Sequence, residues 1–200
     1  MRISKVENRE RITISVRDLV EFIMRAGDID NRSRGMSSSD AMLEGGRIHR
    51  RIQKAQGPEY VAEVSLKAIV EYETFDLVVD GRADGIETTE EYVLVDEIKG
   101  IFGDVDLLEE PFLVHLAQAK CYGAIYGEQK ELETIHIRMT YAQLETERVR
   151  TFTELYQVNE LVEWFHGIIE IYSKWAAMHL EWRRVRNDSI RNLDFPFEYR

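Results

Sequence analysis

The 200-residue chain has the length of a single domain, with 44% hydrophobic and 32% charged residues, which is the composition of a soluble globular protein. Its formal net charge of −11 argues against a protein that holds nucleic acid chiefly by bulk positive charge, although local basic patches are compatible with it. Cys121 is the single cysteine, which excludes an internal disulfide framework, a four-cysteine zinc site and an all-cysteine iron–sulfur cluster. Scattered N-terminal charges and the lack of a long apolar run predict a cytoplasmic protein that does not enter membranes.

Hydrophobic spacing predicts the element order α, α, β, β, β, α, β, β, α. Ser15 stands three residues before Asp18 and forms a candidate capping box for the first helix. A polar stretch at 27–39 is predicted to be a loop. The predicted helices are 16–25, 41–53, 111–127 and 154–184, and the predicted strands are 63–72, 75–84, 92–99, 134–141 and 147–152.

The predicted strands indicate a sheet that is covered by helices. The strand at 92–99 is largely apolar on both faces, which is typical of a central strand. The two strands before it are expected to form a hairpin. These elements predict an α/β fold with a central mixed β-sheet flanked by helices and a long C-terminal helix. The predicted domain is 1–186, including that helix, and 187–200 is expected to be a tail or linker.

Three polar side chains are expected to meet at this sheet. Asp84 is predicted at the end of its strand, where Gly81 and Gly85 allow another group to approach the backbone closely. Glu97 and Lys99 share one face of the next strand. If the two strands pair, two carboxylates lie close together and favour a divalent cation such as magnesium between them. A cation-bound water beside an ammonium group suits phosphodiester hydrolysis.

Two helices carry further polar groups. His115, Gln118 and Tyr122 form a polar stripe on the otherwise apolar helix 111–127, where buried polar groups need partners. His115 is not assigned to the site, because partnering within the buried helix is enough to explain it. The helix 41–53 has Gly45 and Gly46, which are expected to allow close approach of another backbone.

The order of these motifs resembles the RecB-like branch of the PD-(D/E)XK nuclease superfamily. GGRIHRRIQ at 45–53 looks like the upstream histidine motif, and GRADG at 81–85 resembles the metal-binding aspartate motif. DEIKG at 96–100 resembles the E-x-K element, and QAKCYG at 118–123 resembles the glutamine–tyrosine helix. The resemblance covers about residues 16–155 and implies a restriction-endonuclease-like core.

The resemblance implies a role for each matching residue. Asp84 and Glu97 are implied metal ligands, Lys99 is the implied catalytic lysine, and Gln118 and Tyr122 orient that lysine or touch the DNA backbone. The further implied groups are His49 as a metal ligand or phosphate contact, the Ile98 carbonyl as a third oxygen ligand, and Glu63 as an additional carboxylate. The implied metal is Mg²⁺ or Mn²⁺, and with one cysteine no iron–sulfur cluster is expected.

Other interpretations of some of these residues stay open. His49 also fits an ordinary helix histidine, and Glu63 also fits a solvent-facing strand residue. Asp96 falls on the opposite face from Lys99, so Glu97 is preferred as the acidic partner. The residues Arg47, Arg50 and Arg51 are candidate DNA contacts, although a run of charges on a helix is usually only a solvated face.

The function expected from these motifs is a metal-dependent DNA exonuclease in repair or recombination, acting on DNA ends or single strands. The chain has no G-x-x-x-x-G-K-[ST] motif, so a motor would lie in a helicase domain or partner. The tail LDFPFEYR at 193–200 resembles the lead-in to superfamily-two helicases of the XPD or DinG type. The rival hypotheses are a non-catalytic nuclease fold that serves as a DNA-binding or assembly module, and a nuclease directed at RNA.

Overall fold

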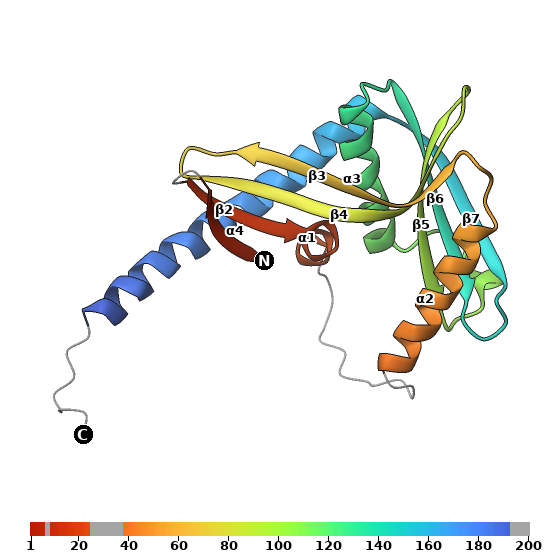
Figure 1. The fold of residues 1–200 in the computed structure, drawn as a ribbon, viewed down its shortest axis with the longest axis horizontal. Helices are drawn as coiled ribbons and strands as arrows, with labels where there is room; N and C mark the ends of the chain where they lie inside the picture. The colour runs from red at the N-terminus through yellow and green to blue at the C-terminus, as the bar shows by residue number, and fades with distance from the viewer. Residues whose placement is uncertain (7–8, 25–37, 193–200) are drawn as a thin grey trace.

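The structure is a computed structural model that describes residues 1–6, 9–24 and 38–192 (Figure 1). The strands are β1 (Arg2–Val6), β2 (Arg9–Ser15), β3 (Tyr60–Glu71), β4 (Phe75–Thr88), β5 (Val93–Ile101), β6 (Thr134–Gln143) and β7 (Val149–Gln157). The helices are α1 (Val16–Ile23), α2 (Ser38–Lys54), α3 (Leu113–Gln129) and α4 (Val158–Arg191), with a short 3-10 helix, η1 (Val105–Leu107). In these residues no helix combines the length and the apolar character that crossing a membrane requires.

The strands form one mixed sheet in the order β1-β2-β4-β5-β6-β7, and β3 pairs with the other edge of β4. The β2–β4 and β5–β6 pairs are parallel, and the β1–β2, β3–β4, β4–β5 and β6–β7 pairs are antiparallel. The predicted hairpin of β3 and β4 is confirmed. The predicted central place of β5, between β4 and β6, is also confirmed.

The sheet opens into a fork along β4. β3 follows one edge of β4 over nearly its whole length. The other edge pairs first with β2, as far as Asp80, and then with β5, starting at Gly85. Because a strand has two edges, β2 and β5 share the second one, and the stretch 81–84 between them has neither strand beside it. A gap in the sheet pairing therefore lies next to Asp84.

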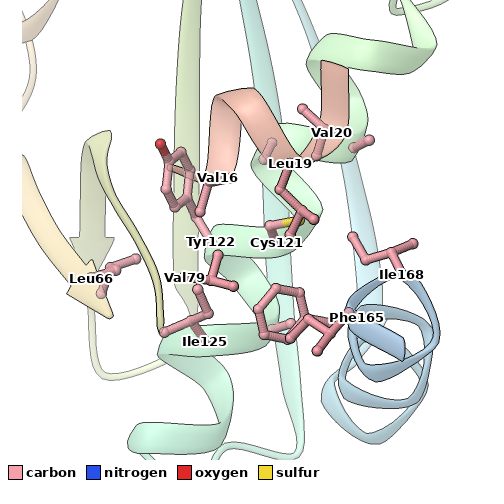
Figure 2. Close-up of a cluster of buried hydrophobic side chains, with 14 of the residues drawn as sticks. Val16, Leu19, Val20, Leu66, Val79, Cys121, Tyr122, Ile125, Phe165 and Ile168 are labelled. Atoms are coloured by element: carbon pink, nitrogen blue, oxygen red, sulfur yellow. The ribbon is translucent and has the colours of Figure 1, made fainter. Parts of the chain in front are cut away.

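Helices cover both faces of the sheet. The larger core joins α1, α3 and α4 to one face, and its packing is drawn in Figure 2 with Val16, Leu19, Val20, Leu66, Val79, Cys121, Tyr122, Ile125, Phe165 and Ile168 labelled. The helix α3 is buried between the sheet and α4, as its nearly uniform apolar sequence predicts. A smaller core joins α2 to the opposite face and consists of Ile48, Ile52, Ile98, Ala142 and Leu144.

The N-terminal strands β1 and β2 are absent from the sequence prediction. Ile12 and Ile14 of β2 are buried in the core, but Arg9 and Arg11 lie between charged and polar neighbours that hide the strand pattern. Both arginines bind Asp76 on β4, at 3.0 and 3.4 Å. Their charges are therefore compensated by a residue far along the chain, which local sequence does not reveal.

Several predicted boundaries are wrong by a few residues. The strand β4 continues to Thr88, so Asp84 lies inside it and not at its end. The helix α3 begins at Leu113, two residues after Pro111. The helix α1 begins after Ser15 as predicted, and Ser15 Oγ accepts the Asp18 N–H at 3.0 Å.

The end of the chain also differs from the prediction. The strand β7 extends to Gln157, so α4 begins at Val158 and not at 154. The helix then runs to Arg191, past 184, and includes the first residues of the predicted tail. Most of the predicted loop at 27–39 and the helicase-like segment 193–200 lie outside the described residues.

Candidate active site

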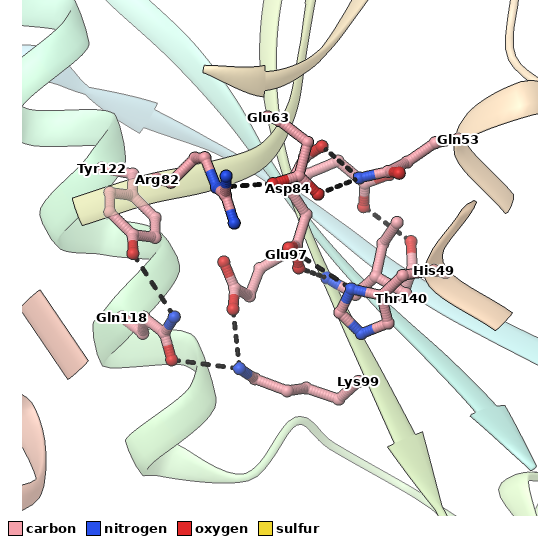
Figure 3. A network of polar contacts seen from close by, with 12 residues as sticks. His49, Gln53, Glu63, Arg82, Asp84, Glu97, Lys99, Gln118, Tyr122 and Thr140 are labelled. Atoms are coloured by element: carbon pink, nitrogen blue, oxygen red, sulfur yellow. Dashed lines mark hydrogen bonds and ion pairs between the residues drawn. The ribbon is translucent and has the colours of Figure 1, made fainter. Parts of the chain in front are cut away.

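The predicted acidic residues and the lysine meet at the fork between β4 and β5 (Figure 3). Side chains alternate along β5, so Glu97 and Lys99 face α3 while Ile98 packs against α2. The pairing of the two strands begins at the Gly85–Asp96 pair, so Asp84 has no partner on β5, and the backbone N–H of Ile98 donates to Asp84 Oδ2 at 2.7 Å. The carboxylate of Asp84 thus takes the place of a strand partner beside β5.

Glu97 is a buried carboxylate with one oxygen that has no hydrogen bond. Its side chain is 2% exposed, and Oε1 lies 2.7 Å from Lys99 Nζ. Oε2 is buried and has no hydrogen-bond partner among the described residues. Burial raises the pKa of Glu97 to about 8, and the nearby charge of Asp84 also raises it, while Lys99 opposes both effects. The site therefore holds an acidic group whose negative charge lacks compensation.

Lys99 is held from two sides. Its Nζ forms the ion pair with Glu97 and also donates to Gln118 Oε1 at 3.1 Å. The amide nitrogen of Gln118 points to Tyr122 Oη at 3.5 Å, which is the outer limit of a hydrogen bond. The structure therefore brings together Glu97, Lys99, Gln118 and Tyr122, as the sequence predicts.

The glycines of β4 provide the close approach that the sequence predicts. A Cβ on Gly81 would lie 2.8 Å from the ring of Tyr122, and a Cβ on Gly85 would lie 1.8 Å from the ring of Tyr60. Both distances are shorter than side chains tolerate, so each aromatic ring needs a glycine beneath it. The groups that approach the β4 backbone on either side of Asp84 are thus side chains of the protein itself.

The helix α2 reaches Asp84 through the gap between the strands. His49 Nδ1 lies 3.4 Å from Asp84 Oδ1. Gln53, one turn later, donates to the backbone carbonyl of Asp84 and to Glu63 Oε1, at 2.9 Å each. Sequence reasoning missed Gln53, although its i+4 spacing from His49 places both on one helix face. The contacts of Gln53 therefore link α2 to β3 and β4 beside Asp84.

Glu63 lies opposite Asp84, between the β3–β4 pairs Ala62–Gly85 and Val64–Ala83. Its φ of 59° is left-handed, a conformation that is uncommon for residues other than glycine. One carboxylate oxygen accepts from Gln53, and the other lies 2.5 Å from Arg82 Nε. Glu63 is therefore close to the site, but both of its oxygens already have partners.

A cleft lies beside Lys99 and leads into this cluster. It has a volume of about 370 Å³ and is lined by Arg17, Glu21, Gly45, Gly46, His49, Lys99, Val114, His115 and Gln118. A Cβ on Gly45 would meet no atom of the described residues within 4 Å, so the absent side chain keeps the cleft wall open. The sequence predicts that another backbone approaches α2 at its glycines. That backbone belongs to β5, since a Cβ on Gly100 would lie 3.8 Å from Gly45 Cα. A larger hollow, of about 660 Å³, lies between β1 and the end of α4 and includes none of the predicted site residues.

The three candidate DNA-binding arginines occupy different surroundings. Arg47 forms ion pairs with Glu44 and Glu147, and Arg51 pairs with Glu147 in the turn between β6 and β7. Arg50 is exposed, and its guanidinium lies 3.5 Å from where a Cβ on Gly46 would be, at the edge of the cleft. Arg50 thus lies near Gly46, which lines the cleft, but is not itself a lining residue, whereas Arg47 and Arg51 are directed toward Glu147.

The donor set around Asp84 and Glu97 suits some kinds of metal site and not others. Within residues 1–6, 9–24 and 38–192, no group of three or more His, Cys, Asp or Glu side chains is arranged to hold a metal ion. Magnesium, however, is commonly bound through one or two carboxylates with water completing its shell. The unpartnered Glu97 Oε2 beside Asp84 fits that kind of site, and it does not fit a closed cage such as structural zinc requires.

Comparison with known proteins adds evidence on the fold. No protein-family model and no curated protein matches the chain. Among solved structures, the chain is similar to an alkaline exonuclease, LHK-Exo, from Laribacter hongkongensis, with a TM-score of 0.55 and 9% identity over 89% of this chain and 94% of that one. It also matches the crystal structure of SSO0001, with a TM-score of 0.48 and 19% identity over 84% and 78% of the two chains. The likeness to the exonuclease confirms the predicted nuclease-type α/β fold.

Proposed function

We propose that this chain is a metal-dependent nuclease that hydrolyses phosphodiester bonds in DNA. The observation that carries the proposal is Glu97, whose buried carboxylate has one oxygen without a partner while Asp84 and Lys99 lie beside it. A stable fold usually satisfies both oxygens of a buried carboxylate. An oxygen left open next to a second carboxylate is suited to a cation, and the adjacent cleft is lined by Lys99, His49 and Gln118.

The residues that would hold Mg²⁺ or Mn²⁺ are Asp84, Glu97 and the Ile98 carbonyl, with His49 as a further ligand or phosphate contact. When bound, such a cation supplies Lewis-acid stabilisation of phosphate charge and a hydroxide nucleophile near neutral pH. Its charge would also compensate the two carboxylates; burial first, and then repulsion from Asp84, raise the pKa of Glu97.

Lys99 supplies a fixed positive charge at the reacting phosphate. Its ammonium group is held by Glu97 Oε1 and Gln118 Oε1, so it needs no reorganisation when negative charge develops there. Gln118 is in turn oriented by Tyr122. In this proposal Lys99 is a catalytic residue, while Gln118 and Tyr122 are positioning residues that act through it.

The proposal extends to an exonuclease that works on DNA ends or single strands in repair or recombination. The structural neighbour is an alkaline exonuclease, which supports the exonuclease class over an endonuclease. The segment 193–200, which resembles a helicase lead-in, supports a helicase domain or partner that delivers the strand. Tethering to such a motor would supply local DNA concentration to a domain whose net charge is −11.

The experiment that tests the proposal is release of labelled nucleotides from single- and double-stranded DNA with Mg²⁺, Mn²⁺ or EDTA. Lys99→Ala is compared with the native chain, and Lys174→Ala, at an exposed position on α4, is the matched control. We expect metal-dependent release in the native chain and in Lys174→Ala, and a loss of at least about 100-fold in Lys99→Ala. Folded protein that binds DNA but releases nothing under any condition would instead support the non-catalytic module. A labelled RNA of the same sequence tests the RNA alternative.

A further inference from the structure

His115 lies on α3 one turn before Gln118, and its ring forms part of the cleft wall. Arg17 and Lys99 line the same cleft. The proposed chemistry gives His115 no role, and partnering within a buried helix does not account for a ring that lines a cleft. Its hydrogen bonds indicate what it can do.

Tyr141 on β6 fixes which nitrogen of His115 carries the proton. Tyr141 is completely buried, and its Oη accepts the backbone N–H of Phe112 at 3.0 Å. The same oxygen lies 3.2 Å from His115 Nδ1. A buried hydroxyl hydrogen needs an acceptor, and Nδ1 is the one that the described residues bring to it. Tyr141 therefore donates to Nδ1, which leaves the proton of the neutral imidazole on Nε2.

The surroundings of His115 keep the ring neutral at physiological pH. Burial lowers the pKa of His115 to about 4; Lys99 and Arg17 also lower it, and Glu21 acts in the opposite direction. The ring of Phe112 packs edge-on against the imidazole, with centroids 5.4 Å apart. Because Nδ1 is occupied and the ring lines the cleft, the Nε2–H group is the one that a bound molecule can meet.

We propose that His115 is a substrate-binding residue that donates a hydrogen bond from Nε2 to a phosphate oxygen of the nucleic-acid backbone, and that Tyr141 positions it. Lys99 and Arg17 both line this cleft, where they form ion pairs with Glu97 and Glu21 at 2.7 and 2.8 Å, and a neutral N–H adds a directional donor beside these two cations. An anion with several oxygens is the ligand class that accepts from all three. The inference rests on the proposed function, because that function supplies the phosphodiester.

The first test measures DNA affinity with three variants: His115→Leu removes the donor, His115→Gln keeps an N–H near the position of Nε2, and Tyr141→Phe removes the positioning hydroxyl. The dissociation constant of fluorescein-labelled oligothymidylate is measured by anisotropy in EDTA, where metal-dependent cleavage is stopped. A hydrogen bond to a charged group corresponds to roughly tenfold in affinity. We expect His115→Leu to lose about that factor and His115→Gln to recover most of it, with melting curves as the control for folding. Native affinity in a folded His115→Leu would overturn the proposal.

The second test reads the tautomer directly and does not depend on catalysis. Long-range ¹H–¹⁵N spectra of histidine-labelled protein distinguish a protonated ring nitrogen from an unprotonated one, and the signals of His115 are those missing in His115→Gln. At pH 7 we expect the Nε2–H form in the native chain, a mixture of tautomers in Tyr141→Phe, and a shift of the Nε2 signal on adding oligothymidylate. An Nδ1–H tautomer or a charged ring in the native chain would overturn the proposal.

Failure of this inference can be told from failure of the proposed function. If the nuclease proposal fails alone, the native chain releases no nucleotides, yet His115→Leu still weakens DNA binding and the Nε2 signal still responds to DNA. If the inference fails alone, the native chain is active and His115→Leu has native KM and affinity. When both hold, we expect His115→Leu to raise KM about tenfold with kcat changed much less.

Discussion

Asp96 and Glu97 are consecutive carboxylates on β5, buried to the same degree on opposite faces of the sheet. Asp96 Oδ1 accepts from Thr140 at 2.6 Å, and Oδ2 accepts from Tyr60 and Arg138 at 3.2 and 2.8 Å. Glu97 has one oxygen bound and one without a hydrogen bond in the residues that the structure describes. The two side chains thus have the same charge and the same burial, but both oxygens of Asp96 have hydrogen-bond partners and only one oxygen of Glu97 has a partner.

This difference separates a carboxylate that stabilises the fold from one that, in the proposed function, binds a cation. The desolvation cost of Asp96 is offset within the protein by three hydrogen bonds, one of them from a guanidinium group. Glu97 has only Lys99, and its raised pKa shows that the charge remains poorly compensated. Replacing Asp96 should therefore lower the free energy of unfolding, whereas replacing Glu97 should not. The loss of activity should be larger for Glu97 than for Asp96.

Glu97→Gln should give the largest effect. It removes the charge that a cation would need and leaves a neutral group of the same shape, so we expect DNA hydrolysis to fall by about 1,000-fold or more. The folded state should survive, because the native carboxylate is already destabilised by burial. Nucleotide release and circular dichroism measure the two effects, and Glu91→Gln, in an exposed turn, is the control. A near-native rate in Glu97→Gln would remove Glu97 from the site.

Asp96→Asn should instead act on stability. One partner of a buried ion pair is removed while Arg138 stays in place, so we expect the free energy of unfolding to fall by about 3 to 5 kcal/mol. Urea denaturation measures it, with Asp106→Asn at an exposed position as the control. If Asp96→Asn were as stable as the native chain while Glu97→Gln unfolded it, the comparison between the two carboxylates would be reversed.

The stability of the metal-free protein should decrease as pH rises through neutrality. The folded pKa of Glu97, about 8, is above the ordinary glutamate value of 4.5, so its contribution is complete below pH 4.5 and is lost as pH rises through 8. His115 has the opposite sign, because its lowered pKa costs stability only as pH falls below about 6.5. Between pH 6.5 and 8 in EDTA, Glu97 should therefore account for a loss of about 2 kcal/mol. Denaturation of Glu97→Gln under the same conditions should lack this slope, and an equal slope in both proteins would contradict the assignment.

Local pattern was enough to predict that Glu97 and Lys99 share one face of β5 and that Asp96 lies on the other, because side chains alternate along a strand. The hairpin and the central strand follow from the same periodicity. The fork does not, because it depends on where β2 stops pairing with β4, and β2 is a short, charge-rich strand. The partner of His115 was equally hidden, since Tyr141 lies 26 positions away and the contact arises only from packing.

Glu63 gives the smallest expected effect and tests the comparison at a third carboxylate. Both of its oxygens have partners, as those of Asp96 do, so its replacement should not cause the loss of activity expected for Glu97. Glu63→Gly relieves a φ of 59°, and Glu131→Gly on the surface relieves a φ of 53° and is the matched control. We expect each variant to gain up to about 1 kcal/mol in the free energy of unfolding, with somewhat less for Glu63→Gly because the Arg82 contact is lost.

The activity of Glu63→Gly then tests whether a carboxylate with partners on both oxygens lies outside the catalytic machinery. Gln53 keeps its bond to the Asp84 carbonyl in this variant, so the proposed metal ligands Asp84 and Glu97 should stay in place. We expect kcat for nucleotide release to remain within about threefold of the native value, because no charge is removed from an unsatisfied position. A loss approaching that of Glu97→Gln, at native stability, would mean that a carboxylate with two protein partners releases them to take part in the site. The single open oxygen of Glu97 would then be an insufficient marker of function.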